Sequence, residues 1–156
     1  MPLLKYKQGN LMQFTEDAFG HGCNCQKRMA SGVAYAVRTT FFEMVEADTA
    51  DEREPKGRLG EMIKVPLGNG RVGYNIYSQF MYGRDTRKVD YDALRKGVTA
   101  VCEDLIEDGK TSLALPRIGC GLAGGEWSVV SGILEEVSNE TGIDITIYDY
   151  EPVKYP

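Results

Sequence analysis

The feature that most constrains this chain is a glycine-rich turn between an apolar strand and a helix. Four glycines fall within the seven residues Gly119–Gly125. They follow a buried strand expected over Ser112–Leu115 and precede a helix expected over Trp127–Thr141. Because such a turn carries few side chains, its backbone N–H groups are open to an anion. The segment therefore predicts a strand–turn–helix unit that can hold a phosphate.

The rest of the chain alternates strand and helix patterns. Strands are expected over Leu3–Lys7, Ala18–Cys23, Glu61–Leu67, Arg71–Gln79 and Ile143–Tyr150. Apolar residues at helical spacing predict helices over Ser31–Ala47 and Tyr91–Glu107. The charged segment Asp48–Gly60 is expected to be an exposed loop. This order predicts an α/β fold, a three-layer α/β/α sandwich with a mixed central sheet, as one domain over residues 1–156.

Composition excludes several kinds of protein. A chain of 156 residues suits one core, and its net charge of −5 argues against bulk binding of nucleic acid. No segment approaches the roughly 20 apolar residues of a membrane span, and the N-terminus lacks a signal-peptide pattern. The four cysteines match neither a disulfide framework nor a zinc site. We therefore expect a cytoplasmic protein with reduced thiols and with no metal or cofactor, whose oligomeric state stays open.

A second strand-to-helix segment, His21–Ala34, has a similar character. Gly32 and its small neighbours would let a ligand approach the backbone, and the amides of residues 32–34 would be unpaired donors of the first helical turn. By itself this segment is better explained as an ordinary helix start capped by Ser31. Ligands of open α/β sheets bind beyond the carboxyl ends of strands. The two loops are therefore expected to face each other at one end of the sheet.

The second of these loops also matches a nucleotide-binding pattern. Gly119, Gly121 and Gly124 fit the G-x-G-x-x-G spacing of dinucleotide-binding proteins. That pattern belongs early in a repeated βαβ domain, with an acidic residue about 20 positions further on. Only one strand is expected after this loop, so a complete dinucleotide-binding fold does not fit. A dehydrogenase is excluded on architecture.

At these two loops the chain resembles the macrodomain family, and the resemblance extends from Gly9 to Tyr150. His21–Asn24 matches the strand end that carries the family's distal-ribose asparagine, and Ala30–Ala34 matches the first phosphate loop. Pro116–Trp127, the most specific stretch, matches the second. The resemblance implies a macrodomain fold and a small-molecule partner, ADP-ribose or a derivative. It points to the branch of ADP-ribose 1''-phosphate phosphatases and deacylating ADP-ribosyl hydrolases.

The resemblance also assigns ligand contacts. Asn10 would accept a hydrogen bond from the adenine amino group, Leu11 would donate its backbone amide nearby, and Tyr150 would stack on adenine. Asn24 would hydrogen-bond a distal-ribose hydroxyl near the reacting carbon. The remaining implied contacts, mostly around the diphosphate and the distal ribose, are Gly9, Ser31, Gly32, Val33, Ala34, Arg117, Ile118, Gly119, Cys120, Gly121, Leu122, Ala123 and Gly124.

Two positions depart from the family's pattern. Many relatives read adenine with an aspartate where this chain has Asn10, whose neutral amide oxygen should bind more weakly. The branch that removes ADP-ribose from glutamate uses a lysine nucleophile and an aspartate of the second loop. Here the aspartate position is Ala123, and Phe80–Gly83, where the lysine would lie, contains none. We therefore do not expect that covalent lysine mechanism.

Three side chains are candidates for chemistry: Asn24, which would position a water, His21 and Asp90. His21 is the only histidine, and an imidazole with a pKa of about 6.5 could serve as acid or base. A strand-end histidine bonded to a backbone carbonyl is the commoner role. Asp90 could be a base, or it could cap the helix that starts at Tyr91. The thiols that flank the site are interpreted as small buried residues, namely Cys23, Cys25 and Cys120.

The sequence supports three functions that share one pocket. The first is a metal-independent phosphatase, a phosphoric monoester hydrolase that converts ADP-ribose 1''-phosphate to ADP-ribose. The second is a hydrolase that removes ADP-ribose or an O-acetyl group from an adduct through a water held by Asn24. The third is a non-catalytic ADP-ribose reader. We take the phosphatase as the leading hypothesis.

Overall fold

The computed structural model describes residues 4–29, 32–83, 86–121 and 123–149. Its six described strands form one sheet in the order β1-β6-β5-β2-β4-β3. Their bounds are β1 Lys5–Gln8, β2 Ala18–Asn24, β3 Met62–Gly68, β4 Arg71–Gln79, β5 Ser112–Leu115 and β6 Asp144–Asp149. Five strands run parallel, and β3 runs antiparallel to β4 at one edge. The mixed sheet expected from the sequence is confirmed.

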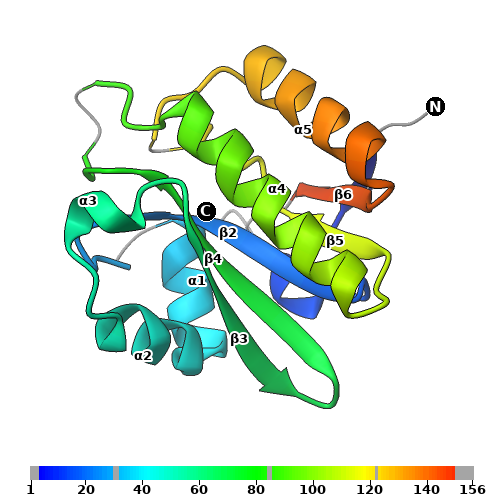
Figure 1. Cartoon of the computed structure of the whole chain (residues 1–156), viewed down its shortest axis with the longest axis horizontal. Coiled ribbons are helices and arrows are strands. Elements are labelled where there is room, and N and C mark those ends of the chain that lie inside the picture. The colour runs from blue at the N-terminus through cyan, green and yellow to red at the C-terminus, as the bar shows by residue number, and fades with distance from the viewer. Residues whose placement is uncertain (1–3, 30–31, 84–85, 122, 150–156) are drawn as a thin grey trace, which may run out of the picture.

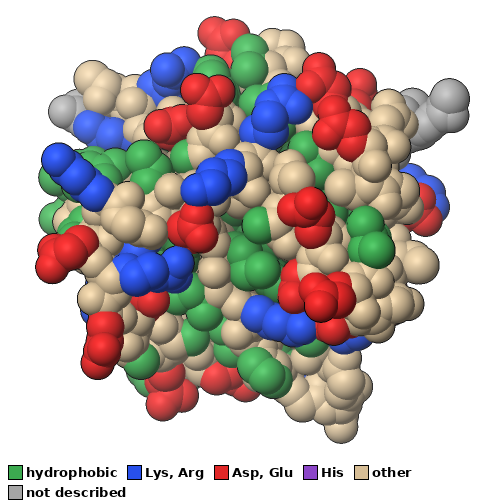
Figure 2. All heavy atoms as spheres, viewed as in Figure 1, with side chains coloured by type: hydrophobic (Ala, Val, Ile, Leu, Met, Phe, Trp, Pro, Cys, Tyr) green, Lys and Arg blue, Asp and Glu red, His purple; other side chains and the backbone are tan. Residues whose placement is uncertain are grey.

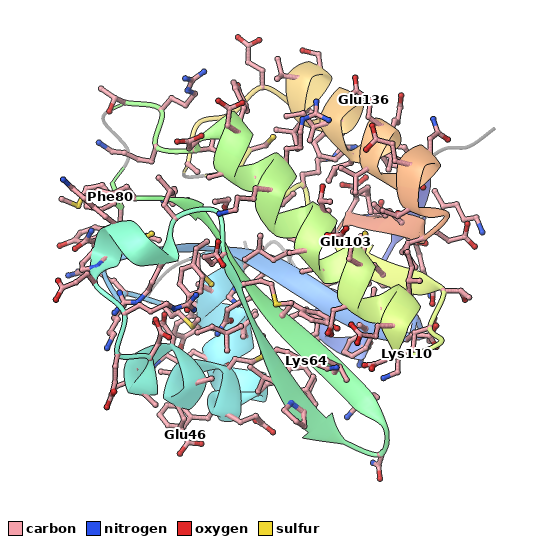
Figure 3. The ribbon with its side chains drawn as sticks, in the orientation of Figure 1. Glu46, Lys64, Phe80, Glu103, Lys110 and Glu136 are labelled. Atoms are coloured by element: carbon pink, nitrogen blue, oxygen red, sulfur yellow. The ribbon has the colours of Figure 1, made fainter. Side chains whose placement is uncertain are left out.

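The parallel strands end at the same edge of the sheet, which brings together the loops that follow them. Figure 3 labels Phe80, just after β4, near this edge, and Lys110, just before β5, toward the opposite one. β2 lies inside the sheet between β5 and β4 and is buried along almost its whole length. The loops after β2, β4 and β5 are therefore neighbours at the carboxyl edge.

Helices cover both faces of the sheet (Figure 1). α4 and α5 lie side by side on one face, while α1, α2 and the short η1 pack on the other. The helix bounds are η1 Leu11–Gln13, α1 Val33–Thr40, α2 Phe42–Ala50, α3 Pro55–Arg58, α4 Tyr91–Glu107 and α5 Trp127–Thr141. The result is the three-layer α/β/α sandwich predicted above.

The helix expected over Ser31–Ala47 is instead two helices, α1 and α2, which are separated at Phe41. Phe41 has non-helical φ and ψ angles of −129° and 74°. Its ring lies 5.6 Å from that of Phe19 on β2, in the core. Tertiary packing of this aromatic side chain therefore overrides the continuous helical pattern of the sequence.

The segment Asp48–Gly60 is not the exposed loop that its charge suggested. It contains the end of α2 and all of α3, and the side chains of Asp48 and Arg58 are buried. The Tyr77 hydroxyl donates to Asp48 Oδ1 at 2.6 Å. Arg58 donates to the Asp51 carboxylate at 2.7 Å and to three backbone carbonyls. Buried charge is tolerated here because each group has bonded partners.

The face of the molecule that bears α4 and α5 carries mixed charge. Acidic and basic side chains are interspersed on it (Figure 2). Over the described ranges, no helix has the length and apolar character needed to cross a membrane. In the same part of the chain, no three His, Cys, Asp or Glu side chains come together in a way that could hold a metal ion.

Candidate functional site

A cavity of about 530 Å³ lies at the carboxyl edge of the sheet. The first loop (residues 25–32) joins β2 to α1, and its described residues form one side of the cavity. The second loop (residues 116–126) joins β5 to α5, and its described residues form the other side. Gly32 and Gly121 both line this cavity. The expectation that the two loops face each other across one site is confirmed.

At the end of the first loop, the first turn of α1 presents unpaired backbone amides to the cavity. The N-cap position of α1 is Gly32, whose φ of 61° favours glycine and which has no side-chain cap. Within the described residues, the N–H groups of Val33 and Ala34 have no acceptor, as is usual for a first helical turn. Both residues line the cavity. The N-terminus of α1 therefore offers donors and a positive dipole end to an anion bound there.

The four glycines of the second loop have two different roles. An added Cβ would lie 2.8 Å from the Val89 side chain at Gly119 and 2.5 Å from a backbone oxygen at Gly125. Gly124 is similarly enclosed, so these three positions permit tight packing of the loop. At Gly121, by contrast, an added Cβ would meet no described atom within 4 Å. Gly121 keeps open the space that a ligand would use.

The backbone donors of the second loop divide in the same way. The N–H groups that bond to carbonyls inside the loop are those of Ile118, Cys120, Gly124 and Gly125. The N–H groups of three cavity-lining residues have no acceptor among the residues described, and they belong to Gly119, Gly121 and Ala123. The second loop thus offers donors opposite those of α1.

Arg117 fastens the second loop to the sheet. Its guanidinium donates to both carboxylate oxygens of Asp149, at 2.7 and 3.0 Å, and lies over the rings of Tyr6 and Trp127. The same guanidinium holds the pKa of Asp149 below its usual range. Arg117 lines the cavity, together with Ile118. Because Asp149 already balances its charge, backbone amides are the stronger anion-binding groups on this side.

Asn24, the last residue of β2, lines the cavity and shapes the first loop. Its Oδ1 accepts from the Gln26 N–H at 2.9 Å and from the Arg28 N–H at 3.4 Å. Its Nδ2 donates to the Arg28 carbonyl at 2.8 Å. An amide NH₂ has two hydrogens, so one stays available to an oxygen atom of a ligand or of a water.

His21 lies outside the cavity lining, and its burial does not favour the predicted catalytic role. It is fully buried on β2, where Nε2 bonds Asn75 Oδ1 at 2.8 Å, and it does not line the cavity. Burial lowers the pKa of His21 to about 4. A buried imidazole that does not line the cavity is poorly placed to exchange a proton with a ligand bound there. His21 is a structural residue of the sheet.

Asp90 is the N-cap of α4, where its Oδ1 accepts from the Ala93 N–H at 3.0 Å. It lines a separate surface groove with Phe80 and Tyr91, not the cavity between the loops. The capping role that the sequence left open is confirmed, and the position of Asp90 outside the cavity lining does not favour the role of general base. Among the described residues that line the cavity, none is Asp, Glu, His or Lys.

The thiols near the site are packed rather than activated. Cys23 and Cys25 are buried and Cys120 is half-buried, with free sulfhydryl groups. Burial raises the pKa of Cys23, which lines the cavity, and also that of Cys120, which does not. The thiols therefore stay protonated near neutral pH and are poor nucleophiles.

The residues expected to read adenine lie at the same edge of the sheet but outside the cavity lining. Gly9 follows β1, and its N–H donates to the Asp149 carbonyl at the end of β6. Asn10 is the N-cap of η1, and its Oδ1 accepts a hydrogen bond from the Met12 N–H at 2.9 Å. The Leu11 N–H has no acceptor among the described residues. Their roles toward adenine stay predictions, and Tyr150 lies outside the described residues.

The structure also identifies cavity residues to which sequence reasoning gave no role. Arg28 comes from the first loop and Tyr82 from the segment after β4, and the Arg28 guanidinium lies 4.7 Å from the centre of the Tyr82 ring. No local motif marks either residue. The predicted contacts Ser31 and Leu122 lie outside the described residues, and Cys120 and Gly124 do not line the cavity.

Comparison with known proteins agrees with this architecture. A family model described as Macro domain matches residues 21–134. ADP-ribose glycohydrolase OARD1 of Bos taurus is 32% identical over 146 residues, 93% of this chain and 90% of that protein. An uncharacterized 17.5 kDa protein of Enterobacteria phage T4 is 30% identical over 161 residues, 97% of this chain and 99% of its own.

A solved structure is similar over nearly the whole chain. A protein of unknown function from Bacteroides thetaiotaomicron has a TM-score of 0.82 at 25% identity, over 94% of this chain and 97% of that one. The family model spans most of the chain, and the sequence relatives are matched over nearly their full length. The sheet order, the two facing loops and these matches together establish that this chain belongs to the Macro domain family.

Proposed function

We propose that this macrodomain binds ADP-ribose in the cavity between the first and second loops. The observation that carries the proposal is the set of unpaired amides on both sides of one cavity, including those of Val33, Ala34 and Gly121. Such amides bind phosphates without basic side chains, which suits a chain of net charge −5. The 32% identity to ADP-ribose glycohydrolase OARD1 supports ADP-ribose as the ligand.

An extended ligand would cross the edge of the sheet from β2 to β1. The diphosphate would lie between the two loops, with the distal ribose beside Asn24 and the adenine toward Asn10 and Leu11. Three strand intervals separate β2 from β1, and at about 4.8 Å each they amount to roughly 14 Å. A span of this size fits a nucleoside diphosphate sugar better than a single phosphate group.

The reaction that we propose is hydrolysis of ADP-ribose 1''-phosphate. A water oxygen would bond to phosphorus while the bond between phosphorus and the ribose oxygen breaks, and that oxygen would leave with a proton as the ribose hydroxyl. The described lining offers no lysine, carboxylate or imidazole. Catalysis would therefore come from amides that stabilise charge on the phosphoryl oxygens and from a water held by Asn24.

A second candidate is release of ADP-ribose, or of an acyl group, from an adduct on the distal ribose. The similarity to OARD1, whose name describes a glycohydrolase, favours it. No lysine is found among the described lining residues, and the position of the family's second-loop aspartate is Ala123, which lines the cavity. Water rather than a side chain would then be the nucleophile. The same cavity would also serve a reader without catalysis.

Calorimetry with ADP-ribose and one pair of variants tests the binding site. Gly121→Glu places a carboxylate where the cavity is open, and we expect it to weaken ADP-ribose binding about tenfold or more by charge repulsion. Gly132→Glu is the matched control, because Gly132 lies in α5 with equally open space around it. Unchanged binding in Gly121→Glu would show that the diphosphate is placed wrongly.

Turnover assays separate the candidate reactions. Release of inorganic phosphate from ADP-ribose 1''-phosphate, reduced in Asn24→Ala and retained in Gly132→Glu, supports the phosphatase. Release of ADP-ribose from an ADP-ribosylated protein, or of acetate from O-acetyl-ADP-ribose, without release of phosphate supports the second candidate. Tight binding of ADP-ribose without any turnover supports the reader and contradicts both reactions.

A further inference from the structure

The two arginines that line the cavity differ in how their charge is balanced. Arg117 is bonded through two nitrogens to the Asp149 carboxylate. Arg28 has no carboxylate within 4.0 Å among the residues that the structure describes. Its guanidinium instead lies over the Tyr82 ring, 4.7 Å from the ring centre. Arg28 therefore brings to the cavity a positive charge that no described acidic group neutralises.

The position of this charge is set from two sides. Asn24 bonds both the N–H and the carbonyl of Arg28, which ties the backbone of Arg28 to the end of β2. Tyr82 comes from the segment that follows β4, the strand next to β2. Stacking on an aromatic face leaves the edge of a guanidinium free to donate hydrogen bonds. The charge therefore lies at the Asn24 end of the cavity, away from β6, where Arg117 is bound.

We propose that Arg28, held by Tyr82, selects ligands whose distal ribose carries an anionic substituent. This inference rests on the proposed function, because Asn24 marks the distal-ribose end only if ADP-ribose binds as described. A phosphate monoester would receive charge-assisted hydrogen bonds from the guanidinium. A neutral acyl ester would also accept hydrogen bonds from the guanidinium, but without the ionic attraction that an anionic phosphate adds. Arg28 is thus a specificity-determining residue that favours the phosphorylated substrate over the acetylated one.

The test compares three compounds on the same variants. Binding of ADP-ribose is measured by calorimetry, and kcat/KM is measured for ADP-ribose 1''-phosphate and for O-acetyl-ADP-ribose. Where a compound is not turned over, its Kd replaces kcat/KM. For Arg28→Gln we expect about a tenfold loss with the 1''-phosphate, the size of one charge-assisted hydrogen bond, and changes below about twofold with the other two compounds.

Arg38→Gln is the matched control. Arg38 is also an exposed arginine stacked on an aromatic ring, that of Phe42, but it does not line the cavity. This variant changes the net charge equally and should leave the preference for phosphate intact. Tyr82→Ala should lose part of the preference, because the guanidinium of Arg28 is no longer held in place.

Salt gives a readout that a purely structural role of Arg28 would not produce. Because salt screens charges, raising the ionic strength from about 0.05 M to about 0.5 M should reduce the difference in kcat/KM, or in Kd, between the wild type and Arg28→Gln for ADP-ribose 1''-phosphate. Equal losses with all three compounds, or no loss with any, would overturn the proposed selectivity. A wild-type protein that fails to bind ADP-ribose would instead contradict the proposed function itself.

Discussion

The two loops that form the cavity are supported in opposite ways. The first loop rests on polar side chains, because the buried Arg58 donates to the Cys25 carbonyl and Asn24 bonds the backbone of Arg28. The second loop rests on the absence of side chains, because Gly119 and its neighbouring glycines let it pack against Val89. The backbone N–H groups of Lys88 and Val89 also donate to the Ala123 carbonyl of the second loop.

This difference shows that similar backbone donors can be positioned by two physical means. A buried polar network holds a loop through bonds that must all be satisfied, so loss of one charged member is costly. Close backbone packing holds a loop through shape, so one added carbon atom is costly. The first two of the following four variants test this contrast, and the other two test the structural roles of His21 and Asp90. They are given in order of decreasing expected effect.

Arg58→Met should destabilise the protein most. It leaves the Asp51 carboxylate and the Cys25 carbonyl without a buried donor, and we expect a loss of about 4 kcal/mol in the free energy of unfolding. Urea denaturation measures it. Arg53→Met is the control: Arg53 binds the same Asp51 but is considerably more exposed, so its loss should stay below about 1 kcal/mol. Equal losses would remove the distinction between a buried and an exposed partner.

Gly119→Ala should destabilise the protein by disturbing the close packing of the second loop. Gly119 has a φ of 76°, and its added Cβ would lie 2.8 Å from Val89. Backbone strain and overpacking together should cost about 3 kcal/mol. Gly121→Ala, where the space is open, should change the free energy of unfolding by less than about 0.5 kcal/mol. The two midpoints in urea would then differ clearly, and coincident midpoints would refute the division of glycines into packing and ligand positions.

We expect His21 to affect the pH dependence of the protein's stability and not its activity. The folded protein keeps it neutral down to a pKa of about 4, whereas the unfolded chain takes up a proton near 6.5. The unfolded state therefore binds more protons between these values, and stability falls as the pH drops through them. We expect a contribution of roughly 2 kcal/mol between about pH 7.5 and about pH 5. Denaturation of wild type and His21→Gln at both pH values should show a shallower dependence in the variant. Parallel curves would argue against a buried neutral histidine.

Asp90→Ala should have the smallest effect, a loss of about 1 kcal/mol from the N-cap of α4. Because Asp90 lies outside the cavity lining, turnover of ADP-ribose 1''-phosphate should be retained. Asp90→Ser keeps a capping oxygen and should recover most of the stability. A fall in kcat of about a hundredfold in both variants would restore Asp90 as a general base.

The sequence predicted most features of the second loop, but it predicted few of the contacts that hold the first loop in place. β4, β5, α4 and α5 begin and end at the predicted residues. Strong hydrophobic periodicity and terminal glycines define these elements, for example Gly142 after α5. The glycines of Gly119–Gly125 likewise predict the second loop from local sequence alone, because closely spaced glycines are typical of a tightly packed turn.

The remaining features depend on contacts between distant residues. The charged run around Arg58 resembles a solvated loop, yet Arg58 is buried because the Cys25 carbonyl of the first loop and the nearby Arg53 carbonyl accept its hydrogen bonds. His21 resembles a strand-end catalyst, but the flanking strands bury it and Asn75 bonds its Nε2. Arg28 and Tyr82 meet only after two loops are brought together by the sheet. No sequence spacing encodes such partners.

The central claim is that backbone amides of both loops bind the diphosphate of one ligand. The most direct measurement follows the amide chemical shifts by NMR during a titration with ADP-ribose. The account predicts that signals from Val33 and Ala34 in the first helical turn and from Gly119 and Gly121 in the second loop shift together, with a single Kd. Shifts confined to one loop, or absent from both while ADP-ribose still binds, would contradict it.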